Sequence, residues 1–294
     1  MAEKLKKWEK YRLVRIGKYM AWSFGANDVM IYAGNATLRI LMSVLPLFML
    51  ILAVLNLLPF YSAETFSAEL THFLPNIPEI QSFIRSILIK LNRQSSGALV
   101  SLAAVTTLWS ASGGIFSIHK ALAGITADGR NTPWDRAMAV GYTAFFLLLI
   151  IAVLLIQVLG NSILNAAGGL AAMLGVPNLF GLFQQILEVS RIVLLVIMFF
   201  FLLLMYRYLP GGKRRWKRQA PGALFTTLLW AAFSALFSYV IPRFWKASAI
   251  YGSMAAVFLV ALWLQYMIVI LLMGGILNQA LTETAAAPDG TKKE

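Results

Sequence analysis

Three ionisable side chains lie inside apolar stretches of the sequence, where a charge is costly. Arg39 lies about eight residues into the segment 31–58, and Glu188 and Arg191 lie one helical turn apart within 182–208. A charge at the centre of a bilayer costs about 2.5 kcal/mol or more, so it normally faces a partner or water. In one interpretation, Glu188 and Arg191 form a neutral structural pair and Arg39 extends to the membrane surface. In the other, the arginines line a cavity that binds an anion such as a lipid phosphate.

A run of small residues, WSASGGIF, is a second candidate site, and it comprises Ser110, Ser112, Gly113 and Gly114. Small side chains let two helices approach closely in lipid, which favours a helix–helix contact. Alternatively, the glycines open the helix onto a polar cavity, with Lys120 one to two turns later at the headgroup level as a further anion ligand. Gly252 and Ser253, in YGSMAA, favour a close contact in the same way.

The composition indicates a membrane protein. Of the 294 residues, 60% are hydrophobic and 13% are charged, whereas about a quarter of a soluble domain is charged. One soluble core of this length cannot hide that excess, so lipid must be the solvent for much of the chain. The sequence has no cysteine, which excludes disulfides, thiolate nucleophiles and cysteine-based metal sites.

Runs free of charged residues predict the membrane-spanning helices, because one crossing needs about 20 mainly apolar residues. We predict an all-α polytopic membrane protein, a six-transmembrane-helix bundle at 31–280. A basic cytoplasmic segment, 1–30, precedes it and a cytoplasmic tail, 281–294, follows. The spans are expected at about 31–58, 97–119, 138–160, 182–208, 220–242 and 251–279. Two inverted halves of three spans are compatible with the single arginine in spans one and four.

The distribution of positive charge predicts the orientation, since Lys and Arg resist translocation. Of the 25 basic residues, 18 lie in the segments 1–20, 120–137, 207–218 and the tail, and five lie in the alternate loops. Both termini are therefore expected in the cytoplasm. The dense basic run is expected to meet anionic lipid headgroups rather than nucleic acid. Its cations are Lys213, Arg214, Arg215, Lys217 and Arg218.

Two further segments are expected to be amphipathic helices. Residues 1–20 lack the apolar core of a signal peptide. They fix the orientation, lie on the membrane as a helix, or do both. In the membrane-bound helix, lipid would face Leu5, Trp8, Tyr11, Ile16 and Tyr19. In the first outer loop, Pro78 suits the first turn of a helix over 78–93. That helix has one apolar stripe, and it either lies in the interface or caps the bundle; the stripe consists of Ile80, Phe83, Ile84, Ile87, Leu88 and Leu91.

Residues for catalysis are sparse. The predicted cytoplasmic segments hold Asp28, Asp128 and Asp135 without paired spacing, and His72 and His119 are predicted on opposite membrane sides. A two-metal nuclease needs several converging carboxylates or histidines, and no HExxH, Walker or GxSxG motif is present. We therefore expect no enzyme, no metal site and no cofactor. Any transport would be passive, ion-coupled or driven by a partner.

Four stretches of the sequence together resemble the YihY/BrkB family of bacterial inner-membrane proteins. They are SVLPLFMLIL, TLWSASGGIFSIHKAL, RYLPGGKRRWKRQAPGALF and IYGSMAAVFLVALWLQYMIVILLMGGILNQAL, in the order and spacing of the family. The resemblance implies six membrane helices and cytoplasmic termini. It implies little about activity: members were once labelled ribonuclease BN, a label regarded as mistaken, and some are linked to serum resistance or proposed to move envelope lipids.

Three functional hypotheses remain. The first is a carrier or flippase for an amphiphilic anion such as an envelope lipid. The second is an envelope scaffold, associated with virulence, that organises partners and moves nothing. The third is the old nuclease label. Membrane lipids are the expected partners, nucleic acid is not, and a homo-oligomer is compatible with the sequence.

Overall fold

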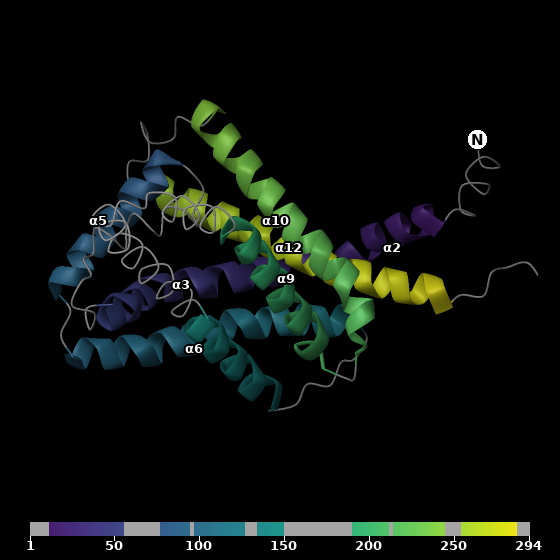
Figure 1. Ribbon diagram of the computed structural model, residues 1–294, viewed down its shortest axis with the longest axis horizontal. Coiled ribbons are helices and arrows are strands. Elements are labelled where there is room, and N and C mark those ends of the chain that lie inside the picture. The colour runs from purple at the N-terminus through teal and green to yellow at the C-terminus, as the bar shows by residue number, and fades with distance from the viewer. Residues whose placement is uncertain are drawn as a thin grey trace, which may run out of the picture.

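The computed structural model describes residues 12–55, 77–94, 97–126, 134–149, 190–211, 214–244 and 254–286. Every regular element in these ranges is an α-helix (Figure 1), so the all-α prediction is confirmed there. The elements, in order, are α2 (Arg12–Ala26), α3 (Val29–Leu55), α5 (Pro78–Gln94), α6 (Gly97–Ile125), a helix at 134–149, α9 (Ser190–Tyr208), α10 (Trp216–Phe244) and α12 (Met254–Ala286).

Three of these helices are long and apolar enough to cross a membrane, by length and composition. The candidate spans are Val29–Ile51, Trp216–Arg243 and Met254–Thr284, and Leu195–Tyr208 is a shorter apolar helix. Each of the six predicted spans contains a helix where the structure describes it. The third and fourth extend into 150–189, outside the described residues. The membrane-spanning character of three helices is thus supported, and the count of six stays a prediction.

A left-handed turn separates α2 from α3. Asp28 has a φ of 48°, which Asp and Asn tolerate better than most residues. Beside it, the Asn27 side chain donates from Nδ2 to the Ser23 carbonyl at 2.9 Å. The turn lets α3 begin at Val29, slightly earlier than the predicted start of the first span.

The helix α2 packs against α12 and does not present Ile16 and Tyr19 to lipid. Ile16 is buried, and the Tyr19 hydroxyl donates to Glu283 Oε1 at 3.2 Å. Burial, reinforced by the Glu283 carboxylate, raises the pKa of Tyr19 to about 12, so the hydroxyl keeps its proton at neutral pH. The lipid-facing expectation is wrong for these two residues because α12 continues to Ala286 and offers them a protein surface. Leu5, Trp8 and Tyr11 lie outside the described residues.

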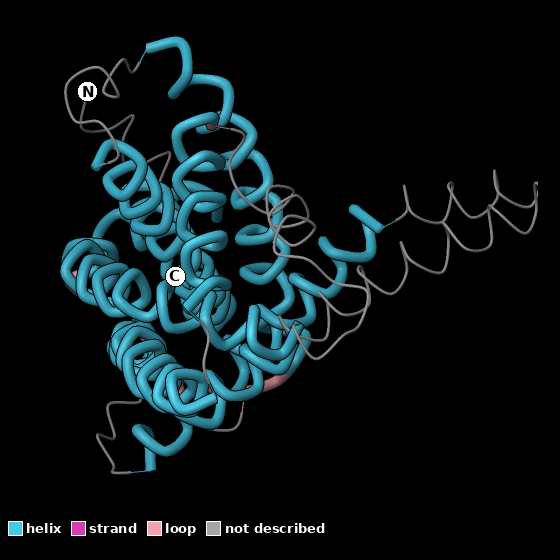
Figure 2. The backbone as a smooth tube through the Cα atoms, turned by 90° about the vertical axis from the view of Figure 1, so that its left-hand side faces the viewer, coloured by secondary structure: helices cyan, strands magenta, loops and turns pink. Residues whose placement is uncertain are grey.

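The main core lies where α3, α6, α9, α10 and α12 meet. Figure 2 shows most of the described helices gathered side by side. The helix α12 contacts α2, α3, α5, α6 and α10, which makes it the central element. Its buried side chains include Leu272 and Ile276, which belong to the same core cluster as Leu122 of α6 and Leu202 of α9. Packing of this kind drives helix association in lipid, where apolar burial alone provides little.

The amphipathic helix α5 caps one end of the bundle (Figure 1). Ile80 and Leu88 from its predicted stripe are fully buried, together with side chains of α3, α10 and α12. Arg85 and Lys90 are exposed on its other face. The structure therefore favours the capping placement, because Ile80, Ile84 and Leu88 of the apolar stripe are covered by protein.

The helices α10 and α12 touch through glycines and are joined by neutral polar groups. A Cβ on Gly222 would lie 2.2 Å from the Gly274 carbonyl oxygen, so neither helix could hold a larger residue there without moving. The Gly222 N–H donates to Asn278 Oδ1 at 2.7 Å, and Asn278 Nδ2 donates to the carbonyl oxygen of Gln219 at 3.2 Å. One turn away, the Tyr206 hydroxyl donates to the Leu271 carbonyl oxygen at 2.6 Å. This contact is tight and its polar groups have partners.

Candidate functional site

The small residues of WSASGGIF form a helix–helix contact. α6 is one continuous α-helix from Gly97 to Ile125, so the prediction that the glycines open the helix is wrong. A Cβ on Gly114 would lie 2.5 Å from Ile40 Cγ1 and 3.3 Å from the Ala36 carbonyl oxygen, which shows that α3 occupies the space of the missing side chain. The hydroxyl of Ser110 donates to the Arg39 carbonyl oxygen at 3.0 Å, across the contact. Ser112 donates within its own helix, to Trp109.

Arg39 lies beside this contact, deep in a candidate span. It follows Val29, the first residue of α3, by ten positions, which is about 15 Å along the helix and half of a hydrocarbon core about 30 Å thick. Its side chain is exposed, and its Nε donates to Asn35 Oδ1 at 2.9 Å. The guanidinium lies over Gly113: a Cβ there would lie 2.8 Å from Nη1. None of the acidic side chains that the structure describes is paired with it, and its hydrogen-bond partner within the described ranges, Asn35, is neutral.

Two further cations contact the aromatic residues of α6. The Arg136 guanidinium carbon, from the 134–149 helix, lies 5.5 Å from the Trp109 ring centroid and 5.2 Å from that of Phe116. Lys120 Nζ lies 5.0 Å from the Phe116 centroid. Lys120 is exposed, and its place at the headgroup level stays a prediction. Sequence reasoning did not single out Arg136, because its partner rings lie on another helix.

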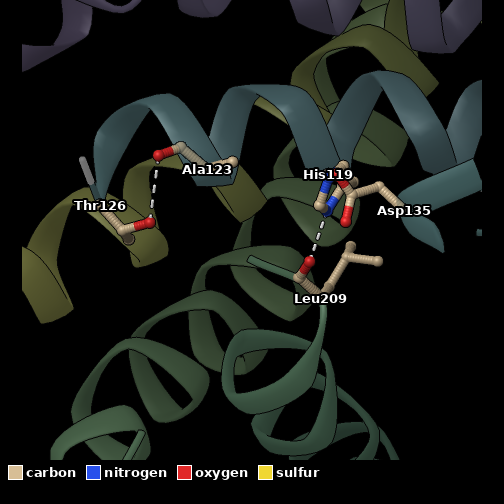
Figure 3. Close-up of polar contacts among 5 residues, drawn as sticks. All are labelled: His119, Ala123, Thr126, Asp135 and Leu209. Atoms are coloured by element: carbon tan, nitrogen blue, oxygen red, sulfur yellow. Dashed lines mark hydrogen bonds and ion pairs between the residues drawn. The ribbon is translucent and has the colours of Figure 1, made fainter. Parts of the chain in front are cut away.

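A buried pair, His119 and Asp135, holds the 134–149 helix against α6 (Figure 3). His119 Nε2 lies 3.6 Å from Asp135 Oδ2, and His119 Nδ1 lies 2.5 Å from the Leu209 carbonyl oxygen at the end of α9. A carbonyl can only accept, so Nδ1 carries a hydrogen. Among the described residues, these are the only buried carboxyl and imidazole side chains. The pair thus joins three elements and positions the neighbouring Arg136.

Sequence reasoning missed this pair. The sequence predicts His119 at the end of a span and Asp135 in a loop, and 16 positions in the chain separate them. The one available signal was that both residues lie near the same predicted membrane face, at the ends of successive spans. That signal gives proximity to a surface, but only the packing of α6 beside the 134–149 helix brings the side chains together.

The other predicted site residues are described only in part. Glu188, Gly252, Ser253 and Lys213 lie outside the described residues, and Arg191 is described only as a helical residue of α9. The predicted roles of Glu188 and Arg191 stay untested. At the start of α10, Arg215, Lys217 and Arg218 are exposed, and Arg214 Nε donates to the Gly211 carbonyl oxygen at 3.4 Å. Close by, the Arg207 guanidinium lies 4.4 Å from the Trp216 ring centroid.

Within the described ranges, no group of three or more His, Asp or Glu side chains is arranged to hold a metal ion. His119 and Asp135 come together without a third ligand of that kind in those ranges. The prediction that the protein has no metal site concerns the whole chain and stays a prediction.

Comparison with known proteins places these features in a family. The sequence model of the family described as Virulence factor BrkB matches residues 21–294. YfkH of Bacillus subtilis, named a ribonuclease-like protein, is 27% identical over 254 residues, covering 85% of this chain and 88% of that protein. Two UPF0761 membrane proteins are also similar. That of Aggregatibacter aphrophilus is 24% identical, over 88% of this chain and 89% of its own length. That of Haemophilus influenzae is 23% identical, over 88% and 92%. No solved structure matches the chain.

Proposed function

The chain belongs to the BrkB virulence-factor family, and two of its relatives are named as membrane proteins. From that premise we propose that it is a carrier for an anionic amphiphile. It would move its cargo between the leaflets of the bacterial inner membrane, with both termini in the cytoplasm. An envelope lipid fits best, because it combines an anionic headgroup with acyl chains that the exposed apolar helix faces can contact.

The environment of Arg39 is the observation that supports a carrier. Its guanidinium is exposed about halfway along a candidate span, with Asn35 as a neutral hydrogen-bond partner. A charge at this depth costs about 2.5 kcal/mol or more unless a partner compensates it. The anionic headgroup of a lipid that crosses the membrane beside α3 would supply that compensation, and the crossing barrier for the headgroup would fall for the same reason.

We include the absence of enzymatic activity in the proposal. His119 and Asp135 are engaged with each other and with the Leu209 carbonyl oxygen, which is a structural arrangement. A metal-dependent nuclease needs several acidic ligands that converge on its ions. The ribonuclease-like name belongs to YfkH, and we do not extend it to this chain.

Leaflet exchange in vesicles tests the proposal. Full-length protein is reconstituted in phosphatidylcholine vesicles that contain a fluorescent phosphatidylglycerol, and the inner-leaflet probe is followed as it becomes accessible to an external quencher. Exchange should be faster than in empty vesicles. Arg39→Ala should slow it about tenfold, the loss expected for one charge-assisted hydrogen bond.

Arg243→Ala is the matched control for that experiment. Arg243 is an exposed arginine in the last turn of α10, and its Nη1 donates to the Tyr239 carbonyl oxygen. Exchange by this variant should equal that of the unmodified protein. Equal rates in empty and protein-containing vesicles would reject the carrier. The scaffold would then be favoured if cells that carry Arg39→Ala behave like cells with the unmodified protein, while changes on an exposed apolar helix face reproduce the effect of deleting the protein.

A further inference from the structure

Four residues of α6 form one narrow face of the helix. Trp109, Gly113, Phe116 and Lys120 follow one another at spacings of four, three and four, which places them in a single stripe. We call it the α6 stripe. It runs from Trp109 to Lys120, which are 11 positions and about 16 Å apart along the axis. Trp109 lies at about the same level along α3 as Arg39, because the neighbouring Ser110 donates to the Arg39 carbonyl oxygen. Lys120 lies farther along α6, toward the end of α3 that joins α2.

Cations from three helices meet this stripe. Arg39 of α3 lies over Gly113, Arg136 of the 134–149 helix lies between the rings of Trp109 and Phe116, and Lys120 of α6 lies over Phe116. Gly113 lies between those two rings in the stripe, so both guanidinium groups approach the same stretch of α6. Like charges that converge in this way repel one another, and the repulsion is relieved when an anion lies between them.

The hydrogen-bonding capacity of these cations is largely unused in the described part of the structure. Arg39 commits Nε to Asn35, while a contact with a ring face occupies no N–H donor. Asp135, the acidic neighbour of Arg136 in the chain, is directed to His119. None of the described acidic side chains is paired with Arg39, Arg136 or Lys120. Planar guanidinium groups with available N–H donors match the oxygens of a phosphate.

We propose that Arg39, Arg136 and Lys120 form a binding site on the α6 stripe for the phosphate headgroup of an anionic lipid. The site deepens the proposed function, on which it rests, by naming the headgroup class and the residues that receive it. A lipid is favoured over a free anion because Arg39 lies at membrane depth on a candidate span, and because Trp109, 72% exposed, offers a large ring beside the cations where acyl chains would lie. Three cations favour a phosphomonoester, which can carry two negative charges, over a phosphodiester, which carries one.

Lipid binding to the full chain tests this site separately from transport. Native mass spectrometry in detergent compares dioleoyl phosphatidic acid, phosphatidylglycerol and phosphatidylcholine, and we expect affinity to fall in that order. Arg39→Gln and Arg136→Gln should each weaken phosphatidic acid binding about tenfold. Lys120→Gln should weaken it about threefold, because an ammonium lacks the planar fork of donors that a guanidinium offers to phosphate.

Two further variants keep all three positive charges, so they test the geometry of the site in a protein that is expected to fold. Arg136→Lys removes the planar fork, and Gly113→Ala places a methyl group 2.8 Å from Arg39 Nη1 and so displaces the guanidinium. Both should weaken binding about threefold while the protein stays folded. Arg243→Gln is the matched control, because Arg243 also lies over a ring, that of Tyr239 at 3.6 Å, but belongs to no such cluster. Its affinity should be unchanged.

Equal losses of phosphatidic acid affinity in the Arg39, Arg136 and Arg243 variants would overturn the site, because they would indicate that the net positive charge of the protein attracts the lipid. Displacement of the lipid by millimolar inorganic phosphate would overturn it in favour of a free-anion site. If the site binds lipid as expected but leaflet exchange is absent, the carrier fails and the site stands. If exchange proceeds while Arg136→Gln and Lys120→Gln bind normally, the site fails and the carrier stands.

Discussion

Two helix pairs in this molecule, α10 with α12 and α3 with α6, approach closely through glycines. Neutral polar groups surround the glycines of the first pair, and a cation lies beside those of the second. In the first, Gly222 and Gly274 bring two backbones together, and the polar groups around them are amides and hydroxyls bonded to one another. In the second, Gly113 and Gly114 bring α3 against α6, and the nearest ionisable group is the exposed Arg39. The same residue type therefore closes one contact and makes room for a cation at the other.

The difference separates a structural contact from a candidate site. Neutral groups that bond one another at α10–α12 stabilise the bundle and need nothing from outside. The cations at α3–α6 cost free energy in lipid unless an anion joins them. Small residues alone do not distinguish the two cases, so the groups around the glycines decide their roles.

Gly222→Ala, at the contact between α10 and α12, should lower the stability of the protein more than the other substitutions. The new methyl group would lie 2.2 Å from the Gly274 carbonyl oxygen, and backbone cannot yield as a flexible side chain can. We expect the free energy of unfolding to fall by about 3 kcal/mol or more, measured by denaturation in detergent. Gly141→Ala is the control, since nothing lies within 4 Å of its added Cβ, and it should be neutral or slightly stabilising. Equal stability of the two variants would show that α10 and α12 do not touch in this way.

Asp135→Ala should come next, because it leaves His119 Nε2 without its buried partner. We expect a loss of about 2 kcal/mol in the free energy of unfolding. A double-mutant cycle with His119→Ala should give a coupling energy of about 1 kcal/mol. Additive effects would contradict the pair. Because the pair positions Arg136, phosphatidic acid binding should also weaken in Asp135→Ala.

Gly114→Ala and Gly113→Ala should divide the α3–α6 contact into its two functions. At Gly114 the methyl group meets Ile40 Cγ1, a stiff side chain, and the Ala36 backbone, so we expect a loss of about 1–2 kcal/mol in stability. At Gly113 it meets the mobile end of Arg39, so the loss should stay below about 0.5 kcal/mol while lipid binding weakens. The comparison fails if both variants change stability and binding in parallel.

Much of the helical architecture could be predicted, because its signals are local. Charge-free apolar runs predicted helices that the structure describes at α3, α6, α10 and α12. Periodicity predicted α5 and its apolar stripe, but it did not decide whether protein or the membrane interface covers that stripe. The first turn of α5 at Pro78 followed from residue chemistry alone, whereas the contact role of Gly114 was one of two interpretations that residue chemistry left open. The lipid-facing assignment of Ile16 and Tyr19 failed, because periodicity finds an apolar face but not what covers it.

The sequence by itself determined that the chain is helical, strongly apolar and basic at its loops, since each of these follows from composition and short-range spacing. Only the tertiary structure decided which charges meet. Arg39, Lys120 and Arg136 come from three different helices. His119 of α6 contacts Asp135 of the 134–149 helix and the Leu209 carbonyl oxygen at the end of α9. No local pattern encodes those meetings, because they depend on how closely glycine allows α3 and α6 to approach and on where the 134–149 helix packs.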